Sequence, residues 1–314
     1  MSETSTTHSG QPSAGGRGPL RAPSFSLGRI WTLATSTFTQ LVRMKTFYFL
    51  IVFALVVVAV GNLDLLYTAE QKLRVIKNTA FGAMSVFSWL FAIAATAMLL
   101  PRDLEDRTLY TILSKPVPRL EYLLGKLGGV MLTIAIALLA MQALFTGVLW
   151  VQEKIALADA YADMKAHSNF TEAEIQTRLR MVAEQGVSWG LLSALWAIFL
   201  KALVVTSFTL LISTFASSSL FTIIVGVIVF IIGHFHKMAV SYWSSALGEG
   251  ALAKVFLKPV ELIFPDLRLF NIVENIVGGQ PVALTALAEM TGLSVLYAAV
   301  YTMIGLYLFI DKEF

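Results

Sequence analysis

The stretch LEDRTLYTILSKPVPRLEYLLGK, Leu104 to Lys126, decides the fold because it stands between two long uncharged runs. Residues 78–100 before it and 127–152 after it contain no Asp, Glu, Lys or Arg. Each run exceeds the roughly 20 apolar residues that a helix needs to cross a bilayer. The charged segment between them therefore predicts a structured connection outside the membrane.

The segment itself has the pattern of a stiff, two-part elbow over residues 101–126. Pro101 is expected to end the preceding helix, because proline disrupts a helix interior. A short amphipathic helix with Leu109, Ile112 and Leu113 on one face follows. The prolines of KPVPR push the residues before them out of helical geometry. A second short helix, Leu120 to Lys126, then leads into the next span. Such stiffness is typical of a surface that receives a mechanical push.

The composition indicates an all-α integral membrane protein. Of 314 residues, 57% are hydrophobic and only 14% are charged, whereas soluble domains carry roughly a quarter charged residues. The absence of cysteine excludes disulfides, thiolate metal sites and cysteine nucleophiles. A net charge of +3 without a clustered basic face suits contact with anionic lipids and does not indicate nucleic acid.

Counting apolar runs predicts six transmembrane helices. The run from Gly186 to Gly233 contains one charge, Lys201, and at 48 residues it would extend about 72 Å as a helix, too long for one crossing. We expect it to break at Ser213–Ser219, where small hydroxyl residues favour a turn. An even number of spans places both termini on one side. The predicted spans are approximately 47–66, 79–100, 127–151, 189–212, 219–235 and 290–310.

The segments around the spans have distinct patterns. Residues 1–24 are rich in Ser, Thr, Gly and Pro and predict a disordered tail. Residues 27–45 predict an interfacial helix anchored by Trp31, Arg43 and Lys45. Its apolar face would carry Ile30, Trp31, Ala34, Phe38, Leu41 and Val42, with Thr37 elsewhere. The alternative is an N-terminal extension of the first span.

Two longer connections are expected on the outer side. Residues 153–188 predict two helices that form a small extracytoplasmic cap, because TEAE at Thr171–Glu174 matches a capping box and Gly186 suits a helix end. Residues 236–289 alternate apolar and polar positions around two prolines in LKPVELIFPDLRLFNIVENIVGGQP, which indicates an interfacial or re-entrant segment. Five cations within residues 101–126 favour a cytoplasmic N-terminus by the positive-inside rule.

The elbow resembles the cytosolic segment before the third span of ABC-2 type transporter permeases. That family commonly has an acidic residue, Gly-Thr, a leucine-rich stretch, a Ser-Lys-Pro-Val-x-Arg-like element, a Tyr and a Gly-Lys. One position departs, because Arg107 stands where the family usually has glycine. The break at Ser213–Ser219 and the FPDLRLFN element extend the resemblance over most of residues 25–314. The matching residues are Glu105, Thr108, Leu109, Leu113, Ser114, Lys115, Pro116, Val117, Arg119, Tyr122, Gly125 and Lys126.

The resemblance implies the membrane subunit of an ATP-driven ABC transporter, an exporter in the cell membrane with both termini in the cytoplasm. A second permease subunit, identical or different, and separate P-loop ATPase subunits are the implied partners. This chain lacks G-x-x-x-x-G-K-[ST], so ATP and Mg²⁺ are expected on the ATPase, with no cofactor and no enzymatic activity here. Glu105 and Arg119 would contact the ATPase or pair with each other. The implied ATPase-coupling residues are Glu105, Thr108, Lys115, Pro116, Arg119, Tyr122 and Lys126.

Lys201, Thr206 and Ser207 are the candidates for a translocation path. A lysine at mid-bilayer costs about 2.5–3.5 kcal/mol on insertion scales, which suggests a polar path or a dimer interior. The alternative is a span that begins later, with Lys201 reaching the outer interface. The two hydroxyls line the path or bond their own helix backbone. His234 and His236, two residues apart, are interpreted as interfacial polar groups and not as a metal site.

Three functions remain open at this stage. The apolar spans without acidic residues favour a lipidic or amphiphilic cargo over a bare ion. A membrane assembly or scaffold protein with an ABC-2-like fold is the first alternative. An intramembrane enzyme is the second, and the lack of paired Asp, Ser/His or zinc-ligand constellations within the spans argues against it.

Overall fold

A computed structural model describes residues 25–43, 48–62, 68–105, 118–166, 171–216, 218–247, 265–280 and 282–310. Every regular element in these ranges is a helix. The elements are α1 (Leu27–Arg43), α2 (Tyr48–Gly61), α3 (Ala69–Glu105), α5 (Arg119–Ala166), α6 (Glu172–Glu184), α7 (Gly190–Phe215), α8 (Ser219–Leu247), the 3-10 turn η1 (Leu267–Phe270), α10 (Val273–Val277) and α11 (Leu284–Ile310).

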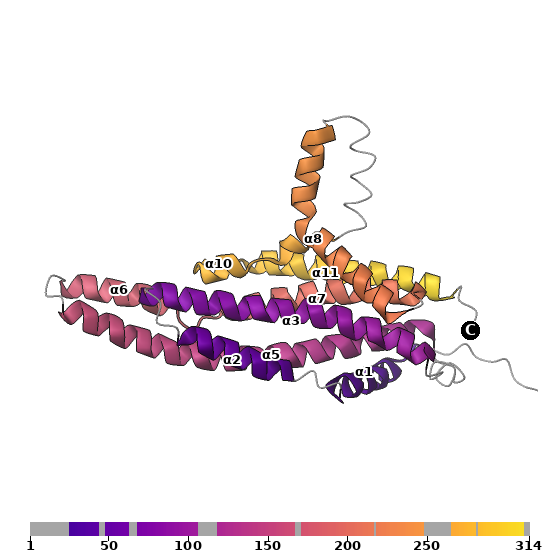
Figure 1. The fold of residues 1–314 in the computed structure, drawn as a ribbon, viewed down its shortest axis with the longest axis horizontal. Coiled ribbons are helices and arrows are strands. Elements are labelled where there is room, and N and C mark those ends of the chain that lie inside the picture. The colour runs from indigo at the N-terminus through magenta and orange to yellow at the C-terminus, as the bar shows by residue number, and fades with distance from the viewer. Residues whose placement is uncertain are drawn as a thin grey trace, which may run out of the picture.

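The helices form an elongated bundle with two different ends (Figure 1). Helix α1, the start of α5 and the end of α11 meet at one end, here called the α1 end. Helix α6 lies beside the last part of α5 at the opposite end, the α6 end. The second half of α8 stands away from the bundle (Figure 1).

Four of the described helices are long and apolar enough to cross a membrane: α3, α5, α7 and α11. Two shorter apolar helical stretches, Leu50–Val60 in α2 and Ser219–Phe235 in α8, correspond to the first and fifth predicted spans. Each predicted span therefore overlaps a helix, and the chain is a multi-pass membrane protein. The predicted break is confirmed, since α7 ends at Phe215 and α8 begins at Ser219.

Two predicted boundaries are wrong. Pro101 does not end the helix that contains the second span, because α3 continues to Glu105. The φ that proline fixes is close to the helical value, and so near the helix end one lost backbone hydrogen bond is tolerated. The predicted helix Leu120–Lys126, the third span and the first half of the cap form one helix of 48 residues, α5. Its last part, through LADAYADMKA, consists mainly of strong helix formers.

Helix α7 lies at the centre of the bundle and packs against α3, α5, α8 and α11. Aromatic pairs join the helices: the rings of Phe81 and Phe145 meet edge to face with centroids 5.4 Å apart, and Trp89 stacks on Phe230 at 4.2 Å. Most of the side chains along α7 are buried, which explains why this helix has no separate polar face.

At the α6 end, the residues of the predicted cap form the last part of α5 and the separate helix α6. The carboxylate of Glu174 accepts the backbone N–H of Thr171 at 2.8 Å and its hydroxyl at 2.7 Å, as expected of a capping box. Helix α6 ends at Glu184, just before Gly186. The buried ammonium of Lys77 on α3 donates to the amide oxygen of Gln185 at 2.7 Å. This hydrogen bond joins α3 to the end of α6.

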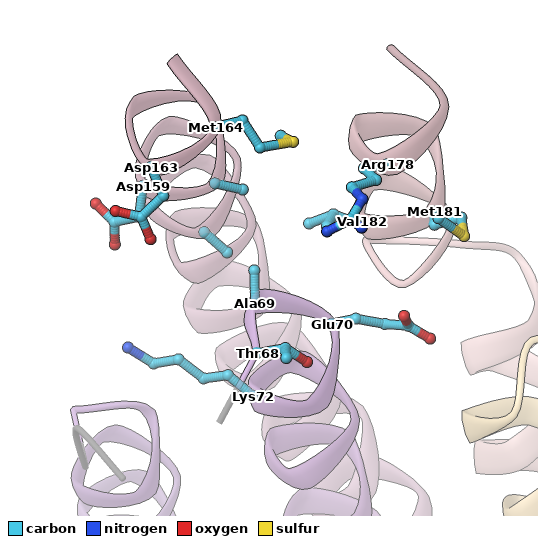
Figure 2. Close-up of a pocket in the computed structure, with 12 residues that line it drawn as sticks. Thr68, Ala69, Glu70, Lys72, Asp159, Asp163, Met164, Arg178, Met181 and Val182 are labelled. Atoms are coloured by element: carbon cyan, nitrogen blue, oxygen red, sulfur yellow. The ribbon is translucent and has the colours of Figure 1, made fainter. Parts of the chain in front are cut away.

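A cavity of about 510 Å³ lies between the start of α3, the last part of α5 and α6. Figure 2 shows Asp159 and Asp163 on α5, Arg178 on α6 and Lys72 on α3 around this space. Thr68 and Glu70 at the start of α3 and alanine, methionine and valine side chains form the remaining lining. The end of the bundle is therefore charged around a partly apolar hollow.

Candidate functional site

The second half of the predicted elbow forms the first two turns of α5. The helix begins at Arg119, directly after Pro118, as expected because proline is well tolerated where a helix starts. Arg119, Tyr122 and Lys126 lie in these turns. Of the other predicted coupling residues, Glu105 is the last residue of α3, without a described side chain. Thr108, Lys115 and Pro116 lie outside the described residues.

Arg119 and Tyr122 connect the start of α5 to the end of α11. The Arg119 guanidinium donates to the backbone oxygen of Phe309 at 2.8 Å and lies 5.8 Å from the centre of its ring. The Tyr122 ring is stacked on the Phe309 ring at 6.2 Å. Lys126 Nζ lies 5.6 Å from the centre of the Tyr122 ring. Because Tyr122 and Phe309 are both almost fully buried, this cluster fixes α5 to the last helix.

Glu121 connects the same turns of α5 to α1. Its carboxylate accepts two hydrogen bonds from the Arg29 guanidinium, at 2.6 and 2.8 Å, and one from the backbone N–H of Ser26 at 2.8 Å. The Glu121 side chain is fully buried, whereas that of Arg29 is 36% exposed. The hydrogen bond that Arg29 donates to Glu121 raises the pKa of Arg29, which stays charged at every physiological pH. A forked, charge-assisted pair of this kind also fixes the relative orientation of the two helices.

Two glycines of α5 allow α1 to pack closely below this ion pair. A side chain at Gly125 would overlap Leu33, and one at Gly129 would overlap Thr37 and approach the backbone oxygen of Ala34 to 2.8 Å. Glycines four residues apart lie on one helix face and permit close backbone approach. We call Arg29, Glu121, Gly125, Gly129 and Thr37 the α1–α5 clamp.

The predicted amphipathic helix α1 is confirmed as a helix, but its buried face differs from the prediction. Ala34, Thr37 and Leu41 are buried, whereas Trp31 is 63% exposed. Thr37 lies on the face that packs on α5, where its small side chain fits opposite Gly129. The link between α1 and α2, residues 44–47 with Lys45, lies outside the described residues, so the alternative of one continuous helix remains open.

The predicted path residues are all buried within α7. The side chain of Lys201 lies in the middle of the helix, 7% exposed, with its Nζ 5.3 Å from the centre of the Phe230 ring. Helix α7 begins at Gly190, and both interpretations of this lysine, a polar path or the outer interface, stay predictions. The hydroxyls of Thr206 and Ser207 donate to backbone oxygens of their own helix, at Ala202 and Val204. This bonding suits a structural role, and their part in a path stays a prediction.

A comparison with protein families matches residues 31–314 to the family described as ABC-2 family transporter protein. The match covers far more than half of the chain. The chain belongs to the ABC-2 transporter family. A comparison with curated proteins found no match.

Family membership gives the arrangement at the α1 end a context. An ABC-2 protein is the membrane subunit of an ABC transporter, which works with an ATPase partner. Among the described residues no group of three or more His, Asp or Glu side chains could hold a metal ion. The contacts at the α1 end fix α1 and α11 to the first two turns of α5.

Sequence reasoning missed the α1–α5 clamp. Glu121 lies in the predicted helix Leu120 to Lys126 without a predicted role, and it is fully buried. Its signal was an acidic residue amid the leucines of LEYLLGK, together with Arg29 on a helix without other cations in its first three turns. The spacing of Gly125 and Gly129 was a second signal, since small residues four apart mark close helix contacts.

Proposed function

We propose that this ABC-2 protein is the permease subunit of an exporter for a lipidic or amphiphilic cargo and is coupled to separate ATPase subunits through residues 104–126. It would span the cell membrane six times, with α2 and the first part of α8 completing the four long spans, and both termini would be cytoplasmic. ATP and Mg²⁺ would bind to the ATPase. Two permease subunits, identical or different, would form the pathway.

The observation that carries this proposal is the attachment of α5 at its first two turns. Residues 106–117 connect α3 to α5, and α5 begins at Arg119 within the motif shared with the family. Glu121 fixes this point to α1, and Arg119 with Tyr122 fixes it to α11. Because these contacts join three helices, a force on the connecting segment would move α1, α5 and the end of α11 together.

Arg119 has a different role in this proposal than the sequence suggested. Its bond to Phe309 makes it an anchor within the permease. The ATPase would then be contacted mainly by the segment before Arg119, which includes Thr108, Lys115 and Pro116. Glu105 lies at the end of α3, on the other side of that segment.

The apolar surface of α1 supports its place at the membrane interface. Phe25, Leu27 and Trp31 are exposed. An apolar hollow of about 510 Å³ lies between α1, α5 and α7, and its lining includes Leu27, Trp31, Leu132 and Phe199. Exposed apolar side chains beside terminal Arg29 and Arg43 suit a helix that lies among lipid headgroups.

The test is co-purification from membranes followed by an ATPase assay. The variant with Glu105→Ala and Arg119→Ala is compared with Glu121→Gln and with Glu172→Gln, an exposed control on α6. We expect a P-loop ATPase to purify with the wild type and the control. Glu121→Gln is expected to keep the ATPase bound while cargo no longer stimulates hydrolysis.

The same experiment separates transport from the scaffold alternative. A wild-type chain that purifies without any P-loop ATPase contradicts coupling through this segment. An ATPase that binds but whose turnover responds to no amphiphilic cargo favours a membrane assembly protein with this fold.

A further inference from the structure

Three basic side chains from three elements lie around one turn of α8. Lys201 of α7 approaches the ring of Phe230, with Nζ 5.3 Å from its centre. Phe230 and His234 are one helical turn apart on α8, with ring centroids 6.1 Å apart. Arg268 of η1 donates its Nε–H to the backbone oxygen of His234 at 2.9 Å.

These groups retain free hydrogen-bonding capacity within the described part of the chain. Lys201 is 93% buried and has no described hydrogen bond or carboxylate partner. His234 Nδ1 is buried without a hydrogen-bond partner among the described residues. Asp266, the acidic residue beside Arg268, accepts the backbone N–H of Arg268 at 3.0 Å and caps η1. A buried cation is unfavourable without a counterion, and no described residue supplies one to Lys201, so this arrangement is suited to receive an anion.

The backbone brings Arg268 to this place through a close contact. A side chain at Gly233 would lie 2.8 Å from the backbone oxygen of Pro265 and overlap Leu267. Glycine at this position therefore lets the segment before η1 lie against α8. Leu267 is buried and Asp266 caps the turn, which together hold Arg268 beside His234. The stacked rings of Trp89 and Phe230 form an aromatic wall next to the lysine.

The depth of Lys201 restricts which anions reach the site. Eleven residues separate it from Gly190 at the start of α7, or about 16 Å of helix. The lysine therefore lies within the apolar part of the span, where a free ion pays a large desolvation cost. An anion attached to a hydrocarbon chain enters the same region from the bilayer.

We propose that Lys201, Arg268 and His234 form a binding site for one anionic headgroup, a phosphate ester or a carboxylate, of a membrane amphiphile. Lys201 and Arg268 would donate charge-assisted hydrogen bonds, and the imidazole would donate one from Nδ1 in the matching tautomer. The proposal deepens the proposed function by naming the charge of the cargo. It rests on that function only in treating the bound amphiphile as the cargo.

The test measures lipid retained by the purified chain in a neutral detergent. The probes are phosphatidylglycerol and phosphatidylcholine with identical acyl chains, and the readout is native mass spectrometry. Lys201→Met and Arg268→Gln remove one donor group each. Lys154→Met is the matched control, since it removes the same charge from an exposed position on α5. The unfolding midpoint of each variant shows that it is folded.

The wild type and Lys154→Met are expected to retain phosphatidylglycerol in preference to phosphatidylcholine. Lys201→Met is expected to lower that preference about tenfold or more, the ordinary effect of losing one charge-assisted hydrogen bond. Arg268→Gln, at a half-exposed position, is also expected to lower the preference for phosphatidylglycerol. It provides the test if the Lys201 variant does not fold.

Two results would overturn the site. Equal retention of both lipids by the wild type excludes an anion preference, and a preference that survives in both folded variants excludes these residues. Displacement of phosphatidylglycerol by inorganic phosphate would identify a soluble anion and contradict an amphiphile. Because no ATPase is present, a failure here is distinct from a failure of the coupling proposal.

Discussion

Gly129→Ala tests the α1–α5 clamp directly, because the added methyl group has no room. It would lie 2.8 Å from the backbone oxygen of Ala34 and closer still to Thr37. Ordinary contacts between such atoms are about 3.5–4 Å, so α1 has to move by about 1 Å or the contact stays strained. Overpacking of this kind costs about 1–3 kcal/mol.

Gly147→Ala provides the matched control on the same helix. Nothing lies within 4 Å of a methyl group at this position. Both substitutions gain the same helix propensity, about 0.8–1 kcal/mol, so the difference between the two variants isolates the clash at α1. We therefore expect Gly129→Ala to be less stable than Gly147→Ala by about 1–3 kcal/mol.

The assay is denaturant-induced unfolding of both purified variants in one detergent, followed by cargo-stimulated ATP hydrolysis with the partner ATPase. Gly129→Ala is also expected to lose stimulation, since a displaced α1 no longer moves with α5. Equal stability of the two variants would refute the close packing of α1 on α5. A destabilised Gly129→Ala with full stimulation would refute the role of that packing in coupling.

Three further changes test other parts of the account. Phe309→Ala removes a buried ring stacked on Tyr122 and is expected to lower the free energy of unfolding by about 3–5 kcal/mol; an effect below about 1 kcal/mol would contradict the α5–α11 contact. Lys201→Met is expected to abolish transport in vesicles while leaving the yield of folded protein unchanged, and intact transport would exclude its part in the path. The hydrogen bonds from Thr171 lower the pKa of Glu174 below its ordinary value of 4.5, so the cap is fully formed above that value and is lost as pH falls through the lowered pKa. The protection of the first turn of α6 against hydrogen exchange, expressed relative to the intrinsic rate at each pH, should therefore fall with acid in the wild type. An identical fall in Glu174→Gln would contradict this cap.

The positions of the helices could be predicted from the sequence because hydrophobic run length is a local property. The break between Phe215 and Ser219 and the capping box at Thr171 also follow from neighbouring residues. The continuity of α3 through Pro101 could not be predicted, since one local breaker competes with helix formers on both sides. The length of α5 could not be predicted either, because no helix-ending residue separates its apolar part from its polar end.

The contacts at the α1 end depend on pairs distant in the sequence. Arg119 and Phe309 are 190 residues apart, and Arg29 and Glu121 are 92 apart. The motif identified Arg119 as important, but only the fold shows that its guanidinium is bound to the backbone of α11. Conversely, Glu121 is outside the family pattern, and only its burial reveals that it is an anchor.

The most direct test of the central claim is a cross-link from the connecting segment to the ATPase. The chain contains no cysteine, so Lys115→Cys carries a single thiol-linked photo-cross-linker, and Glu172→Cys on α6 is the matched position at the opposite end. The account predicts an adduct from residue 115, identified by mass spectrometry as a P-loop ATPase, and none from residue 172. An adduct from residue 172 alone would show that the α6 end, and not the connecting segment, faces the ATPase. The absence of an ATPase adduct from residue 115 in an active complex would contradict coupling through this segment.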